Sequence, residues 1–150
     1  MSNIFDSADC AKILERIEAL SAESRPQWGK MGVAQMLAHC NVTYEMVYED
    51  KHSKPNPIKG FILRLFIKPM VVGDKAFGRN KPTAPQFVIK DDKDFESERA
   101  RLVAFIDKTQ ELGGGNFEGK ESLSFGKLTT KEWNAMFHKH LDHHLNQFGV

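Results

Sequence analysis

Four segments of the chain carry apolar residues at the three- and four-residue spacing of an amphipathic helix, and no long segment alternates with the two-residue period of a strand. The predicted helices cover approximately residues 7–20, 31–48, 94–112 and 130–148. A length of 150 residues is typical of one domain. We therefore expect a single all-α domain over residues 1–150, in which these helices pack as a four-helix bundle.

The connection between the second and third predicted helices is long, at more than forty residues. It contains a fifth amphipathic piece, residues 58–67, whose apolar face is formed by Ile58, Phe61, Ile62, Leu65 and Phe66. We expect this piece to be a short extra helix that packs its apolar face on the core. The Gly- and Pro-punctuated residues 73–92 that follow are typical of a lid or a binding surface.

The charge balance argues against a nucleic-acid-binding protein, because Lys and Arg number 21, Asp and Glu number 20, and the net charge is +1. Residues 51–81 are an exception, since they hold eight basic residues and a single acidic one, Asp74. A basic amphipathic helix can lie on an anionic membrane surface, and the same charge can attract an anionic small molecule. A helix packed on the core with its lysines in solvent is the simpler interpretation, so we expect no membrane partner.

The two cysteines, Cys10 and Cys40, fall on the apolar stripes of the first and second predicted helices. Two cysteines cannot form a disulfide framework or a four-cysteine zinc site, so we interpret them as reduced core residues. The first residues lack the basic start and apolar run of a secretory signal. The longest apolar stretch, residues 58–72, is interrupted by charged residues and a proline and is too short to span a bilayer. These features favour a cytoplasmic location.

Four of the six histidines lie in the last predicted helix. On a helical wheel His140 and His144 fall in the middle of its apolar side, one turn apart. Side chains four residues apart share one helix face, with Cβ atoms about 5–6 Å apart, so two imidazoles at this spacing can hold one metal ion. His39, at the edge of the apolar stripe of the second predicted helix, is the best candidate for a third ligand.

Other interpretations of the histidines stay open at this point. A lone inward histidine is more often a hydrogen-bonded core residue than a metal ligand, and clustered histidines can form a pH-responsive patch. We expect His52, His138 and His143 to be solvated surface residues.

The sequence identifies no catalytic acid or base. Asp142 and Lys139 point away from the core on the wheel, and Glu45 lies two turns from His39 on a face that the pattern does not define. His143, on the flank of the last helix, is a candidate proton shuttle.

Two short motifs resemble those of the DinB-like (YfiT-like) superfamily. Residues 140–147 resemble its His-x-x-x-His-x-x-Gln signature, and residues 35–39, preceded by Trp28, resemble its Trp…Leu-x-His motif. The motifs stand about 100 residues apart, as in that superfamily, and the resemblance covers nearly the whole chain. The Lys-Pro-Thr-Ala-Pro loop at residues 81–85 and the ending of the chain look most like an uncharacterised branch of it.

This resemblance implies a four-helix bundle with a divalent metal ion, such as Zn, Ni or Fe, held by His39, His140 and His144. It also implies a homodimer. Relatives include thiol transferases that act with bacillithiol or mycothiol, an isomerase that uses mycothiol, and metal-dependent hydrolases. Our hypothesis is a metal-dependent thiol (S-)transferase or hydrolase that takes a small-molecule substrate or a thiol cofactor. The alternative is a non-catalytic bundle that acts as a binding or dimerisation module, or as a peripheral binder of anionic surfaces through residues 51–81.

Overall fold

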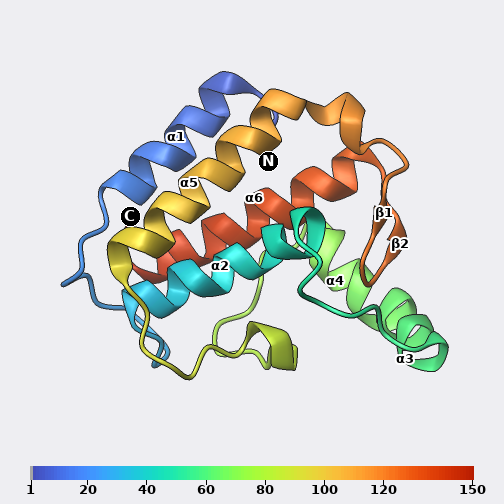
Figure 1. Ribbon diagram of the computed structural model, residues 1–150, viewed down its shortest axis with the longest axis horizontal. Coiled ribbons are helices and arrows are strands. Elements are labelled where there is room, and N and C mark those ends of the chain that lie inside the picture. Colours follow the sequence, from blue (N-terminus) through green and yellow to red (C-terminus); the bar gives the residue numbers. More distant parts are fainter. Residues whose placement is uncertain (1) are drawn as a thin grey trace.

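A computed structural model describes residues 2–150, which form a mostly helical fold with one small two-stranded sheet (Figure 1). Its longest helices are α1 (Ser7–Glu18), α2 (Val33–Tyr48), α5 (Phe95–Leu112) and α6 (Thr130–Gln147). Each of them lies within one of the predicted segments, so the helical periodicity is confirmed. None of the helices in the described part of the chain is long and apolar enough to cross a membrane.

Local side-chain chemistry explains where these helices begin and end. The Asp6 carboxylate accepts hydrogen bonds from two backbone N–H groups in the first turn of α1, and the Asp94 carboxylate accepts one from the Ser97 N–H at the start of α5. At α6, Thr129 and Glu132 form a reciprocal capping box. Helix α5 ends at Gly113, whose φ of +72° is a conformation that glycine adopts readily.

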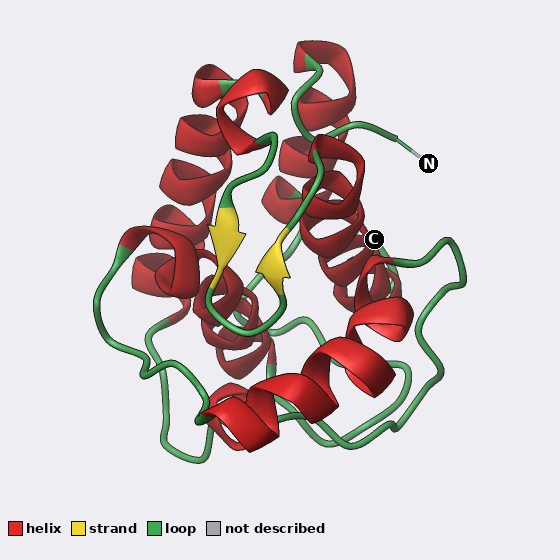
Figure 2. Cartoon of the chain, turned by 90° about the vertical axis from the view of Figure 1, so that its right-hand side faces the viewer, coloured by secondary structure: helices red, strands yellow, loops and turns green. Residues whose placement is uncertain are grey.

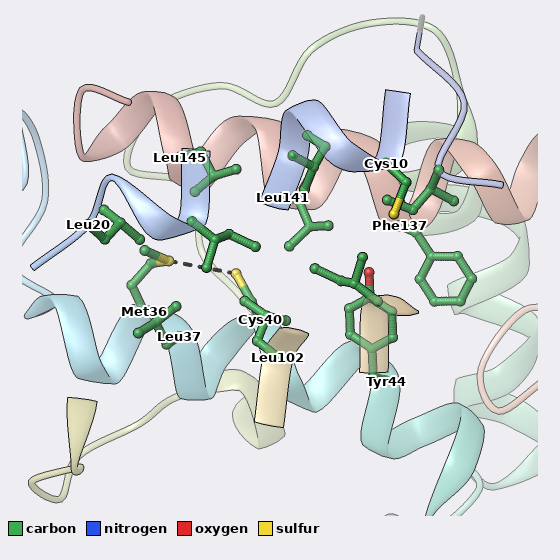
Figure 3. Packing of buried hydrophobic residues seen from close by; sticks show 14 of the residues in the cluster. Cys10, Leu20, Met36, Leu37, Cys40, Tyr44, Leu102, Phe137, Leu141 and Leu145 are labelled. Carbon is green, nitrogen blue, oxygen red and sulfur yellow. Dashed lines mark hydrogen bonds between the residues drawn. The ribbon is translucent and has the colours of Figure 1, made fainter. Parts of the chain in front are cut away.

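The core lies between these helices, with α1 and α2 each in contact with both α5 and α6. Figure 3 shows side chains of α1, α2, α5 and α6 meeting in one apolar cluster. Its centre is aromatic, with the ring of Tyr44 stacked on that of Phe137 at 5.0 Å between ring centroids. Cys10 and Cys40 are buried in this cluster as free thiols, as predicted.

The long crossover contains a continuous helical segment over residues 57–72, which we call the surface helix. It consists of α3 (Pro57–Ile62), a π-helical turn (Leu63–Ile67) and α4 (Lys68–Val72). The predicted extra helix is therefore present and longer than expected, but the prediction that its apolar face packs on the core is wrong. That face is exposed, because α1, α2, α5 and α6 already enclose the core and the main contact of the segment with these helices is that of α4 with α6.

Short elements complete the chain. Pro85–Phe87 and Gly114–Phe117 form 3-10 turns, and β1 (Glu121–Ser122) pairs antiparallel with β2 (Gly126–Lys127) between α5 and α6. The sequence did not predict this hairpin, because strands of two residues are too short to show a period of two.

Candidate metal centre

Three histidines from α2 and α6 come together where these helices pack against each other. One ring nitrogen of each of His39, His140 and His144 lies within 4.8 Å of the others. The Nε2 atoms of His39 and His140 are 2.9 Å apart, and the His144 ring lies 4.5 Å from that of His39 between centroids. Among the His, Cys, Asp and Glu side chains of the described residues, this is the one group of three or more that lies close enough together to hold a metal ion. The structure thus brings together the residues that the sequence singled out.

Two of these imidazoles are held by groups that can only accept a hydrogen bond from Nδ1. His39 Nδ1 lies 2.8 Å from the carbonyl oxygen of Phe87, and His144 Nδ1 lies 2.8 Å from Gln147 Oε1. The Gln147 amide is itself oriented, because its Nε2 donates to the carbonyl oxygen of Trp28. Both Nδ1 atoms therefore carry a proton, and in the neutral rings both Nε2 atoms present a lone pair to the centre.

The third imidazole, His140, faces a partner that can play either role. Its Nδ1 lies 3.0 Å from the Thr43 hydroxyl oxygen, which can accept or donate. With a proton on Nδ1, His140 adds a third lone pair to the centre. With the proton on Nε2, it donates to His39 Nε2 instead, and Thr43 donates to Nδ1. Thr43 thus supports the cluster both with and without a cation.

Burial keeps all three rings neutral. Loss of hydration lowers the pKa of His39 and of His140, and it lowers the pKa of His144 to about 3. The neighbouring imidazoles lower the pKa values of His140 and His144 further. Neutral imidazole is the form that binds metal, so near neutral pH the three side chains are ready to act as ligands.

A cavity of about 530 Å³ lies beside the cluster. Phe77 and His143 stand between them, since both line the cavity and the His143 ring is 5.0 Å from that of His144. The guanidinium of Arg79 also lines the cavity and stacks over Trp28, 4.2 Å from the ring centroid. The cavity therefore combines aromatic rings with charges of both signs, because the carboxylate of Asp142 also lines it.

Lys139 lines this cavity as well. The helical wheel places its side chain away from the core, and the structure shows that it is nevertheless buried. Its ammonium group donates to the carbonyl oxygens of Met70, Gly73 and Lys75 at 2.7–3.0 Å. Burial lowers the pKa of Lys139. The chain after the surface helix folds over this part of α6, which a helical wheel cannot show.

The remaining histidines differ from the prediction, since His52, His138 and His143 are half-buried and not fully solvated. His143 lies at the cavity, where a proton shuttle would be useful. His52 lies 2.9 Å from the carboxylate of Glu45.

The carboxylates considered from the sequence do not belong to the histidine cluster. Glu45 is bound by Arg101 of α5. Asp142 forms an ion pair with Arg16 of α1 at 2.8 Å.

Sequence reasoning missed the supports behind the histidines. Thr43 follows His39 by one helical turn, so the i, i+4 spacing could have revealed it. Gln147 follows His144 by three residues, so the i, i+3 spacing could in the same way have predicted that these two side chains meet. The Phe87 carbonyl is a backbone group of a distant loop, and no side-chain pattern identifies it.

Comparison with known proteins assigns the chain to a family whose function is not known. The family model described as "Protein of unknown function (DUF1569)" matches residues 4–149. No curated protein and no solved structure matches the chain.

Proposed function

Because the chain belongs to the DUF1569 family, for which no function is known, its role has to be inferred from its site, and we propose that it binds one divalent metal ion through the Nε2 atoms of His39, His140 and His144. The observation that carries this proposal is the set of partners at Nδ1. Histidines that bind metals almost always donate their other ring N–H to an acceptor, and each of these rings has such a partner.

The distances support a common ion. Metal–nitrogen bonds of about 2.0–2.1 Å place two ligand nitrogens about 2.9–3.4 Å apart at bond angles between 90° and 110°. The Nε2 atoms of His39 and His140, at 2.9 Å, already have this separation. The ligand nitrogen of His144 is within 4.8 Å of both, and binding of a common ion requires it to move closer to them.

Three protein ligands leave a coordination position open, which is typical of catalytic metal sites. A metal ion there lowers the pKa of a bound water or thiol and so supplies a nucleophile at neutral pH. With the resemblance to DinB-like proteins, this favours a thiol (S-)transferase or a hydrolase. We place the small-molecule substrate or thiol cofactor in the adjacent cavity, where Arg79 attracts an anionic group and His143 moves protons.

The proposal also includes the type of helical bundle, the cellular location and the oligomeric state. We take α1, α2, α5 and α6 to be the helices of a DinB-like bundle, and the contacts of α1 and α2 with both α5 and α6 support this. The free, buried thiols of Cys10 and Cys40 support a cytoplasmic location. The homodimer that the resemblance implies stays a prediction.

Titration of the metal-free protein with Co²⁺ tests the proposal. We expect wild-type protein to develop the visible absorption of nitrogen-coordinated Co²⁺ at one equivalent, and His144→Ala to lose it. His138→Ala is the matched control, because it removes a half-buried histidine of the same helix. Equally weak absorption from wild type and His144→Ala would overturn the proposal.

A non-catalytic module is the second candidate, and the ability of Thr43 to donate to His140 favours it. In that case a His140-to-His39 hydrogen bond satisfies the buried rings without an ion. The Co²⁺ titration separates the two candidates, since the module predicts folded protein that stays colourless. If metal binds, the loaded protein would be assayed for ester hydrolysis and thiol transfer, with Arg79→Ala expected to raise KM for anionic substrates.

A further inference from the structure

The surface helix carries most of the large hydrophobic side chains that are exposed in the described part of the chain. Six of the eight large hydrophobic side chains that are exposed within residues 2–150 belong to it: Ile58, Phe61, Ile62, Leu65, Phe66 and Met70. Phe61 and Phe66 are 60% and 63% exposed, respectively. Clustered exposed hydrophobic side chains of this kind usually mark an interaction site.

These apolar side chains share one side of the segment. Their spacing of three and four residues places them on one helix face, whereas Leu63, Ile67 and Val71 are half-buried. In Figure 2 the segment crosses the lower part of the molecule, and no other part of the chain passes in front of it. The segment therefore behaves as an amphipathic helix whose apolar face lacks a partner within the described chain.

Positive charges surround this face. Lys59 and Arg64 are exposed, and neither has a carboxylate within 4 Å among the described residues. Residues 51–81 hold a single acidic residue, Asp74, but Lys51, Lys54 and Lys68 pair with carboxylates of other segments, so Lys59 and Arg64 are the cations of the surface helix that remain without one among the described residues. A partner of complementary chemistry has to offer both an apolar layer and negative charge.

A second copy of this chain does not meet that requirement. A two-fold contact would bring the same cations of both copies together, because such an interface pairs a surface with itself. A bilayer with anionic phospholipids offers both features, with acyl chains beneath a layer of phosphates.

We propose that the surface helix docks the protein on an anionic phospholipid surface. Phe61, Leu65 and Phe66 enter the acyl boundary, while Lys59 and Arg64 contact lipid phosphates. The C-terminal part of the segment is tied to α6, because Lys139 donates to the carbonyl oxygen of Met70 and Lys68 pairs with Glu132 at 2.9 Å. Docking of the segment would therefore fix the orientation of the whole molecule relative to the lipid surface. This proposal does not depend on metal binding.

Cosedimentation of the full chain with vesicles tests it. We expect wild-type protein to bind vesicles that contain phosphatidylglycerol, to bind less at high salt, and to stay in solution with pure phosphatidylcholine. Phe61→Ser/Phe66→Ser and Lys59→Glu/Arg64→Glu should each weaken binding at least about tenfold. Leu112→Ser, which changes an exposed apolar residue elsewhere, should bind like wild type.

All the substituted side chains are exposed, and an unchanged melting temperature would show that the fold is retained. The proposal is overturned if wild type does not bind anionic vesicles or if the double Phe variant binds equally well. It is also overturned if wild type is a dimer in solution that the Phe substitutions dissociate, since a second copy would then cover the face. His140→Ala should bind vesicles normally, which separates this test from that of the metal site.

Discussion

The partners behind the histidines, more than the histidines themselves, give the site its chemical character. The Phe87 carbonyl and the Gln147 amide accept hydrogen bonds from Nδ1 of His39 and His144, and so direct the Nε2 lone pairs of these two rings to the centre. Thr43 does the same for His140 when its hydroxyl oxygen accepts from Nδ1. The sequence could predict His140 and His144, since their spacing alone places them together. It could not predict the Phe87 carbonyl, because a backbone acceptor in a loop leaves no trace in residue types.

Thr43→Val tests this dependence on a supporting residue. Valine has the shape of threonine without the hydroxyl, so His140 Nδ1 loses its partner while all three ligands remain. We expect the affinity for zinc to fall about 10- to 100-fold by isothermal titration. Thr43→Ser should restore it. Thr109→Val, which removes a buried hydroxyl bonded to Tyr48, should leave zinc affinity unchanged. An unchanged affinity in Thr43→Val would contradict the role of Thr43.

At the scale of elements, α6 uses two sides for different purposes. One side supplies core residues and the histidine pair, while the other buries Lys139 under the chain that follows the surface helix. Periodicity predicted α6 and the other long helices, because the pattern repeats over many residues. It could not show what covers a face, so the packing of the surface helix was predicted incorrectly and the burial of Lys139 was not foreseen.

Lys139→Met tests how firmly the crossover is held. Methionine keeps the length of the side chain but leaves the carbonyls of Met70, Gly73 and Lys75 without their donor. We expect a loss of about 1–3 kcal/mol in the free energy of unfolding, measured in urea, and faster proteolysis within residues 73–92. Lys131→Met is the control on the same helix, since Lys131 is exposed and its ion pair with Asp74, at 3.6 Å, is also solvent-exposed and contributes little to stability. Equal stability and proteolysis of the two variants would show that Lys139 does not hold the crossover.

At the scale of the whole molecule, a charged network joins α2 to α5. Arg101 binds the carboxylates of Glu45 and Glu98, and Glu98 also accepts a hydrogen bond from Asn41. Burial alone would raise the pKa of Glu45, but hydrogen bonds from Arg101 and His52 outweigh it and hold the pKa below its ordinary value. A carboxyl group with a lowered pKa in the folded state stabilises that state only while it is ionised.

Acid should therefore weaken the contact between α2 and α5. The stabilisation from Glu45 is present above the pKa of an unfolded glutamate, about 4.3, and is lost as the pH falls through the lower folded value. We expect Glu45→Gln to be less stable than wild type at pH 7 and the difference to shrink below about pH 4. Urea denaturation of both proteins across this range measures it. A difference independent of pH would mean that Glu45 contributes by packing alone.

The metal content of the native protein tests the central claim most directly. Protein without a tag, purified without chelator or a nickel column, would be analysed for metals beside His140→Ala and the control His138→Ala. We predict about one equivalent of a divalent metal in wild type and in His138→Ala, and a loss of it in His140→Ala. Metal-free wild-type protein that stays metal-free after addition of zinc or nickel would contradict the account and leave the three histidines as a buried hydrogen-bonded cluster.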